Sequence, residues 1–259
     1  MVAMASGYGQ YCPLSLAAEL LCQRWTLLVV SRILSGCARF NEIHRGVPRM
    51  SPTLLSRRLG ELEQAGIVRR RDSRRGGGHE YELTRAGRDL EGIVGSLAIW
   101  GQAWARDLEM QDLDPGFLVW SMHARIDSAR MPPGRTVVEF DFTGAPVDCA
   151  KFWLVHREGT VEMCLKDPGL DVDLVVTSDL LVFVEAWRGF RDFRHEIRIG
   201  RIRLIGEERL RQAFPDWLRP DSLAAFPRHR AGRERSLALR TKRRRDDGSG
   251  PALPARKSR

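Results

Sequence analysis

The sequence has little of what catalysis, metal binding or membrane insertion requires. It contains no Gly-x-Ser-x-Gly, Walker or dinucleotide-binding motif, so we predict that the protein is not an enzyme and holds no cofactor. Its five cysteines form no CxxC pair and its six histidines no HExxH spacing, which argues against a disulfide framework and a metal site. No apolar run approaches the roughly 20 residues of a membrane helix, and no secretory signal is visible. We therefore expect a cytoplasmic protein without a membrane partner.

Positive charge comes almost entirely from arginine and is unevenly distributed. The net charge is +9, and residues 228–259 alone hold twelve basic against three acidic residues. Residues 1–105 carry fourteen basic and nine acidic residues, whereas residues 106–227 carry sixteen and twenty-one. A length of 259 residues suits two compact domains. We predict domains over residues 1–108 and 112–227, followed by a disordered basic tail over 228–259, which either adds non-specific DNA affinity or only solubilises the chain.

Short helices are predicted near the start of the chain. The spacing of the apolar residues in the segment WTLLVVSRIL predicts a helix with Trp25, Leu28, Val29 and Ile33 on one face. A second short helix covers RFNEIHRG, with Phe40 and Ile43 turned inward.

A third helix is predicted from Ser51 to Ala65. Ser51 is a good N-cap and Pro52 suits the first helical position. The buried stripe consists of Leu55, Leu59 and Leu62. The opposite face carries small polar groups and arginines, which are suited to hydrogen bonding with base edges and phosphates. An ordinary amphipathic surface helix would show the same pattern.

Two strand-like segments, IVRRR and HEYEL, follow this helix and flank a glycine-rich loop over residues 72–78. Arg69, Arg70 and Arg71 precede the loop, and Arg74 and Arg75 lie within it beside three consecutive glycines. Helices, a capped third helix and a basic hairpin in this order predict a winged helix, whose third helix enters the major groove. The glycines would let the wing approach the DNA backbone, and the arginines would release counterions from it.

Many short motifs between residues 11 and 105 also fall in an order typical of one family. They are Cys12-Pro13, Arg24-Trp25-Thr26-Leu27-Leu28, Arg39-Phe40-Asn41-Glu42-Ile43, the Leu55/Leu59/Leu62-Glu63 spacing, Gly66, Tyr81-Glu82-Leu83-Thr84, Gly87 and Trp100-Gly101. Together they resemble the HxlR-type winged-helix regulators of bacteria, which implies a dimeric transcription factor. The chain departs from the family at Gly76-Gly77-Gly78-His79, where the wing usually carries prolines, and at Gln23-Arg24, where a small residue and a lysine are usual.

Twelve residues are accordingly predicted to contact double-stranded DNA. They are Arg39, Arg49, Ser51, Pro52, Thr53, Ser56, Arg57, Arg58, Arg71, Arg74, Arg75 and His79.

Thr84 is predicted to cap one further helix, RAGRDLEGIVGSLAIWGQAWAR. Its near-heptad seam consists of Leu90, Ile93, Val94, Leu97, Gly101 and Trp104. A self-complementary seam suits a two-fold dimer, so we predict a homodimer. The alternative is that the seam packs on the protein's own second domain.

Beyond residue 112 the pattern changes. Alternation predicts strands in TVVEFDF, DVDLVVTSD and RIRLIG, and a hairpin in KFWLVHREGTVEMCLKD around the turn Arg157-Glu158-Gly159. Helices are predicted in PGFLVWSMHAR, LLVFVEAWRGF and EERLRQAFPDWL. The predicted fold class is therefore α+β, with an N-terminal winged helix-turn-helix, a dimerisation helix and a C-terminal α/β sandwich.

The later half of the second domain resembles the sterol-carrier-protein domain. The resemblance is carried by Thr177-Ser178-Asp179, Gly200, Ile202, Leu204 and Gly206. It implies an apolar tunnel for a lipid-like or aromatic effector, with Trp120, Phe140, Phe142, Trp153, Met163, Phe183 and Trp187 as candidate ligand-binding residues. The same side chains would equally form an ordinary core.

Cys12 is the one residue to which the family resemblance assigns a reactive role. In some members the matching cysteine looks like an oxidation sensor that joins the two subunits, so Cys12 is the candidate redox site. That role needs a partly exposed thiolate near positive charge. A buried structural cysteine is the alternative.

The sequence thus predicts a dimeric, sequence-specific DNA-binding regulator, a repressor modulated by a small apolar ligand in its second domain. The alternative function is a lipid or small-molecule carrier, or a sequestering module, whose winged helix makes protein contacts. A steep loss of DNA affinity with rising salt would separate the two functions.

Overall fold

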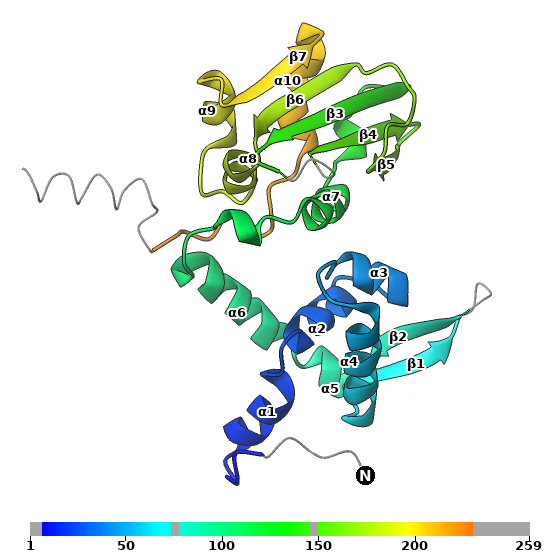
Figure 1. Cartoon of the computed structure of the whole chain (residues 1–259), viewed down its shortest axis with the longest axis vertical. Helices are drawn as coiled ribbons and strands as arrows, with labels where there is room; N and C mark the ends of the chain where they lie inside the picture. Colours follow the sequence, from blue (N-terminus) through cyan, green and yellow to red (C-terminus); the bar gives the residue numbers. More distant parts are fainter. Residues whose placement is uncertain (1–6, 74–77, 146–149, 230–259) are drawn as a thin grey trace, which may run out of the picture.

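The computed structural model describes residues 7–73, 78–145 and 150–229. This part of the chain forms two lobes, one of helices and a hairpin and the other around a five-stranded sheet (Figure 1). The predicted DNA contacts at Arg74 and Arg75 lie outside the described residues, as does residue 230 onward of the predicted tail. Arg228, at the start of that tail, donates to Asp107 Oδ1 at 2.7 Å and to the carbonyl oxygen of Ala105 at 2.9 Å.

The N-terminal lobe contains the predicted helices and hairpin. Its elements are α1 (Pro13–Leu21), α2 (Thr26–Leu34), α3 (Phe40–Arg45), α4 (Pro52–Gln64), β1 (Val68–Asp72), β2 (His79–Leu83), α5 (Arg85–Arg88) and α6 (Glu91–Trp104). The single helix predicted after Thr84 is wrong, because the chain forms two helices, α5 and α6, separated near Leu90. No single described helix is long and apolar enough to cross a membrane, and α1 and α2 meet those criteria only as a pair bent by 82°.

The core of this lobe lies between α2, α3, α4 and the hairpin. Ile43 is fully buried, as predicted, and Phe40 packs against the core from its edge. The prediction for Leu28 is wrong, since 49% of this residue is exposed. Trp25 has a left-handed backbone conformation, with φ of 77°, so the helix begins only at Thr26. The buried face of the helix therefore includes Val30 in place of Leu28.

The C-terminal lobe is a mixed sheet with strand order β5-β4-β3-β6-β7. Its strands are β3 (Arg135–Thr143), β4 (Lys151–Arg157), β5 (Thr160–Cys164), β6 (Leu174–Asp179) and β7 (Ile202–Gly206), and its helices are α7 (Pro115–His123), α8 (Leu180–Trp187), α9 (Phe193–Arg198) and α10 (Glu208–Trp217). β3 and β6 are parallel, and the other neighbouring strands are antiparallel. The predicted β4–β5 turn is confirmed, because Glu158 (φ 48°) and Gly159 (φ 81°) have the left-handed conformations of a two-residue hairpin loop.

The C-terminal helices pack on one face of the sheet. α7, α8 and α10 contribute Met122, Phe183 and Trp217 to the same buried cluster as Phe140 and Phe142 of β3. The opposite face carries a smaller cluster formed by Val137, Trp153 and Val155. The lobe is therefore a layered α/β domain, in agreement with the predicted α+β class.

The two lobes contact each other through side chains of α2, α6 and the residues preceding α4. Arg32 lies over the ring of Trp120, with 4.8 Å between its Cζ and the ring centroid. Arg49 forms an ion pair with Asp114, the N-cap of α7. At the end of α6, Gln102 Nε2 donates to the carbonyl oxygen of Arg188 at 3.2 Å.

Candidate nucleic-acid interface

The predicted reading helix, α4, begins and packs as expected. The Oγ atom of Ser51 accepts a hydrogen bond from the backbone N–H of Leu54 at 3.3 Å, and Pro52 occupies the first turn. Leu55, Leu59 and Leu62 are at most 1% exposed, so they fix the helix to the lobe along one face. The N-terminal turn of α4 and its opposite face are therefore directed toward solvent.

The exposed face of α4 carries Thr53, Ser56 and Arg57. The side chain of Arg57 is 71% exposed, and its Nε atom lies 2.9 Å from Glu61 Oε1, one turn further along the helix. A solvent-exposed pair of this kind contributes little to stability, so the guanidinium is available to another anion at small cost. These three side chains form a polar surface of the kind that contacts base edges and phosphates.

Two of the predicted DNA contacts are bound by groups of the protein itself. Only 11% of the Arg58 side chain is exposed, and its guanidinium pairs with Glu61. Arg49 is directed toward the second lobe, where it contacts Asp114 Oδ2 at 3.1 Å and donates to the carbonyl oxygens of Gln111 and Leu113. Sequence alone could not separate these arginines from Arg57, because all three look like surface cations.

Carboxylates line the same hairpin as the predicted wing arginines. Arg69 and Arg71 both pair with Glu82, at 2.8 and 3.3 Å. Arg39 pairs with Glu80 at 3.5 Å across a short β-bridge that ties the start of α3 to β2. The described walls of the wing are therefore partly neutralised, which the run of arginines in the sequence did not indicate.

Two other hairpin residues differ in their surroundings. Arg70 is exposed opposite Tyr81, and it has no carboxylate partner among the described residues. Arg70 was counted among the wing arginines expected to release counterions but was not one of the twelve predicted DNA contacts. Its place in IVRRR, on the strand face opposite Arg69 and Arg71, was a usable signal. The Nδ1 atom of His79 lies 3.0 Å from Asp72 Oδ1 across the hairpin end.

The predicted dimer seam is divided between two surroundings. Leu90 is buried in the N-terminal lobe and Val94 packs against that core. Ile93, Leu97 and Trp104, together with Trp100, are exposed along one side of α6, with Trp100 61% exposed. The alternative prediction was that the seam packs on the second lobe. In the described residues α6 is buried against that lobe only near its end, at Gln102 and Ala103.

The predicted ligand-binding residues do not gather around one described cavity. Phe140, Phe142 and Phe183 are fully buried and pack on one another, with ring centroids 4.9 Å apart for Phe142 and Phe183. Trp153 belongs to the cluster on the opposite face of the sheet, and Met163 packs at the edge of the main core. Trp120 and Trp187 instead line a hollow between the lobes.

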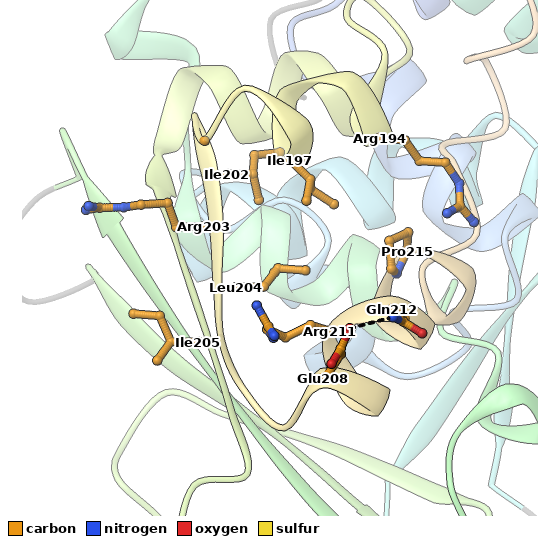
Figure 2. Close-up of a pocket in the computed structure, with 11 residues that line it drawn as sticks. Arg194, Ile197, Ile202, Arg203, Leu204, Ile205, Glu208, Arg211, Gln212 and Pro215 are labelled. Carbon is orange, nitrogen blue, oxygen red and sulfur yellow. Dashed lines mark hydrogen bonds between the residues drawn. The ribbon is translucent and has the colours of Figure 1, made fainter.

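A separate groove of about 660 Å³ lies between α9, β7 and α10. Figure 2 shows Ile197, Leu204 and Arg211 around it, with Arg203 extending away on the far side of β7. Glu208 and Gln212 of α10 are joined by a hydrogen bond of 3.0 Å. This groove holds none of the residues predicted to bind the effector.

Cys12 is exposed at the N-cap of α1, so the alternative of a buried structural cysteine is wrong. Backbone N–H groups of Ser15 and then Leu14 lower the pKa of its thiol by stabilising the thiolate. Cys37 shows the opposite behaviour, because burial raises its pKa. The thiol is thus exposed, as the predicted redox role requires, but its pKa is lowered by hydrogen bonds and not by a positively charged group among the described residues.

Comparison with known proteins identifies the N-terminal lobe. The HxlR-like helix-turn-helix family matches residues 20–109. The uncharacterized HTH-type transcriptional regulator YvaP of Bacillus subtilis is 37% identical over 103 residues, covering 39% of this chain and 88% of YvaP. This chain belongs to the HxlR-like helix-turn-helix family. It is therefore related to HTH-type transcriptional regulators, as the sequence motifs predicted.

Other proteins are also similar to this HxlR-like chain. Rv3095 of Mycobacterium tuberculosis, also named an uncharacterized HTH-type transcriptional regulator, is 42% identical over 94 residues, which is 34% of this chain and 56% of Rv3095. The chain thus spans little more than half of that relative. Among solved structures, the redox regulator HypR in its reduced form is 33% identical with a TM-score of 0.33, covering 35% of this chain and 91% of HypR. The reduced transcriptional regulator YodB of B. subtilis is 30% identical with a TM-score of 0.33, covering 39% of this chain and all of YodB.

Proposed function

We propose that this HxlR-like protein is a sequence-specific DNA-binding regulator that acts as a homodimer. The observation that carries the proposal is the solvent-directed polar face of α4, which is fixed from behind by three buried leucines. In a helix-turn-helix protein this is the element that enters the major groove. Thr53 and Ser56 are the proposed contacts to base edges, and Arg57 is the proposed contact to a guanine edge or a neighbouring phosphate.

Backbone contacts would come from the start of α4 and from the wing. Ser51 and Pro52 form the exposed N-terminus of α4 at the same surface. Helix N-termini attract phosphate groups. Arg70 lies on the hairpin without a described carboxylate partner. Arg71 and His79 remain proposed wing contacts, each of which would exchange a carboxylate of the protein for a phosphate of the DNA.

The proposed dimer uses the exposed apolar side of α6. Ile93, Leu97, Trp100 and Trp104 recur at intervals of three and four residues, so they form one continuous stripe. A two-fold axis through this stripe would bring two copies of α4 to successive major grooves, about 34 Å apart. Exposed apolar side chains that form one continuous stripe are typical of a protein interface.

The proposed mode of action is repression that a small ligand modulates. Such a ligand has to bind two conformations of the dimer with different affinity in order to change operator binding. The sterol-carrier-like tunnel proposed for the second lobe receives no support from its described core, where phenylalanine rings fill the space beside the sheet. For the same reason the carrier function is the weaker alternative.

Selection of bound duplexes from a random-sequence library tests the proposal. We expect enrichment of an inverted repeat whose half-site centres lie about one helical turn apart, with two protomers bound per duplex. We also expect the logarithm of affinity to fall linearly with the logarithm of salt concentration, by about 0.9 per phosphate contact. Failure to enrich any motif, together with salt-independent binding of small apolar molecules, would favour the carrier instead.

A further inference from the structure

The hollow between the two lobes differs from the interior of either lobe. It encloses about 740 Å³ and is lined by residues that include Arg32 of α2, Val94 and Ala98 of α6, and Phe117 and Trp120 of α7. Sites for small molecules commonly have volumes of this order and occur between domains. The hollow therefore has the size and the position of an effector site.

Arg32 is the most unusual group in its wall. The guanidinium lies 4.8 Å from the ring centroid of Trp120 and 5.6 Å from that of Phe117, and it donates to Ser31 Oγ at 3.1 Å. Its Nε atom is buried without a hydrogen-bond partner, and no carboxylate lies within ion-pair distance among the residues described. Arg32 is only partly exposed, and a cation whose buried N–H lacks a partner is costly, so this guanidinium is suited to receive an anion.

Most acidic groups around the hollow pair with arginines other than Arg32. Asp112 is bound by Arg106 at 2.6 Å, and Asp114 by Arg49 at 3.1 Å. Asp221 lies 3.8 Å from Arg188 Nε and accepts a hydrogen bond from the backbone of Leu223. Glu91 is exposed at the start of α6. Asp221 attracts Arg32 electrostatically, but no described carboxylate lies within ion-pair distance of Arg32.

A second arginine lies in the wall of the same hollow. The Nη2 atom of Arg188 donates to Gln102 Oε1 at 2.8 Å, while its Nε atom is buried and makes no hydrogen bond. Burial of Arg32 lowers the pKa of its guanidinium, as expected for a cation with too few counter-charges. Each of the two arginines thus has one buried Nε–H group without a hydrogen-bond partner.

Flat aromatic surfaces complete the site. Phe117 and Trp120 lie nearly parallel, with an interplanar angle of 21° and ring centroids 5.8 Å apart, and Trp187 lines another part of the wall. Gly46 leaves room for this arrangement, since a Cβ atom there would lie 2.4 Å from Arg32 Cδ and 3.3 Å from Trp120 Cζ2. The wall thus combines an anion-binding group with a stacking surface.

We propose that the inter-lobe hollow binds an aromatic carboxylate, with the carboxylate on Arg32 and the ring against Trp120. The regulatory consequence rests on the function proposed above. Arg32 belongs to α2, which packs against α4, and the same hollow is lined by the proposed dimerisation helix α6. A ligand there contacts the elements that determine the spacing of the two reading helices.

Isothermal titration of the full chain with 2-naphthoate and with the neutral 2-naphthamide tests the site without any substitution. We expect the carboxylate to bind at least about tenfold more tightly than the amide, because only the carboxylate pairs with Arg32. Arg32→Gln should lower naphthoate affinity by about the same factor, and Arg32→Lys should recover part of it. Arg211→Gln, in the groove of Figure 2, is the matched control and should leave the affinity unchanged.

Equal affinities for naphthoate and naphthamide would overturn the proposal, as would a loss caused by Arg211→Gln in place of Arg32→Gln. The duplex selection keeps this result separate from the proposed function. A protein that selects a duplex but does not bind naphthoate contradicts the site alone. A protein that binds naphthoate through Arg32 but selects no duplex contradicts the regulator and leaves the site in place.

Discussion

Arg49 of the N-terminal lobe and Asp114 of the C-terminal lobe form an ion pair with 3.1 Å between Nε and Oδ2. The other carboxylate oxygen of Asp114 accepts the backbone N–H of Phe117 at 2.9 Å and so caps α7. Arg49 also donates to the carbonyl oxygens of Gln111 and Leu113. An arginine that the sequence suggests as a DNA contact therefore joins the helix-turn-helix lobe to the helix that lines the inter-lobe hollow.

A double-mutant cycle on this pair should detect the coupling. For Arg49→Ala and Asp114→Ala we expect an interaction energy of about 0.5–1 kcal/mol in urea unfolding, since solvent screens a pair that is partly exposed. Operator affinity should change much less for Arg49→Ala than for a substitution on the exposed face of α4. A coupling energy of zero together with a large loss of operator affinity for Arg49→Ala would contradict this prediction. Arg49 would then contact DNA and not Asp114.

Glu61 limits the charge that α4 presents. It pairs with exposed Arg57 and with largely buried Arg58. Glu61→Gln should raise the affinity for random duplexes severalfold and steepen the salt dependence by about one phosphate contact, because it frees Arg57 and removes a nearby negative charge. Fluorescence anisotropy over a salt series measures both effects.

Glu63→Gln is the matched control for that prediction. It removes the same charge from the same helix at an exposed position, without disturbing the Arg57 pair. Glu63→Gln should therefore change affinity less than Glu61→Gln. Identical gains for the two variants would show that only the net charge of the helix matters.

The exposed stripe on α6 should control the oligomeric state. Leu97→Glu places a charge in the centre of the proposed apolar interface, where it would be buried without a partner. We expect native mass spectrometry to show a dimer for the unmodified protein and a monomer for this variant. Ile205→Glu, at an exposed apolar residue of β7, should leave the dimer intact, and a dimer that tolerates Leu97→Glu would require a different interface.

The secondary structure was largely predictable because its signals are local. The cap and leucine stripe of α4, the wing strands and the β4–β5 hairpin all follow from spacing and turn residues. α1 was missed because none of its residues is buried, although Pro13 at its first position was a usable signal. Leu28 was misplaced because spacing does not reveal that the helix begins only after Trp25.

The functional site was less predictable because it depends on contacts between distant segments. Arg57 and Arg58 are adjacent in sequence, yet one is exposed and the other is largely buried against Glu61. The stacking of Arg32 on Trp120 joins residues from different lobes, so no local pattern announces it. The apolar residues expected to line a tunnel pack instead into a core, which composition alone does not distinguish from a pocket.

Cys12 should be the more reactive of two cysteines with opposite pKa shifts. Hydrogen bonds from Ser15 and Leu14 lower its pKa, so more thiolate is present at neutral pH than for an ordinary thiol, whereas burial raises the pKa of Cys37. Iodoacetamide labelling followed by peptide mass spectrometry should show faster labelling at Cys12, with its half-maximal rate at lower pH. The two rates should converge in concentrated urea, and equal rates in the folded protein would contradict the assignment.

The exposed face of α4 is tested most directly by the affinities of the unmodified protein and Arg57→Ala for a selected operator and for a random duplex. If this face reads the sequence, Arg57→Ala lowers operator affinity by about 1–3 kcal/mol and random-duplex affinity by clearly less. Measurement of both affinities at several salt concentrations separates base recognition from phosphate attraction. An operator affinity that Arg57→Ala leaves unchanged, or a loss that is equal on both duplexes, would contradict the assignment of α4 as the reading helix.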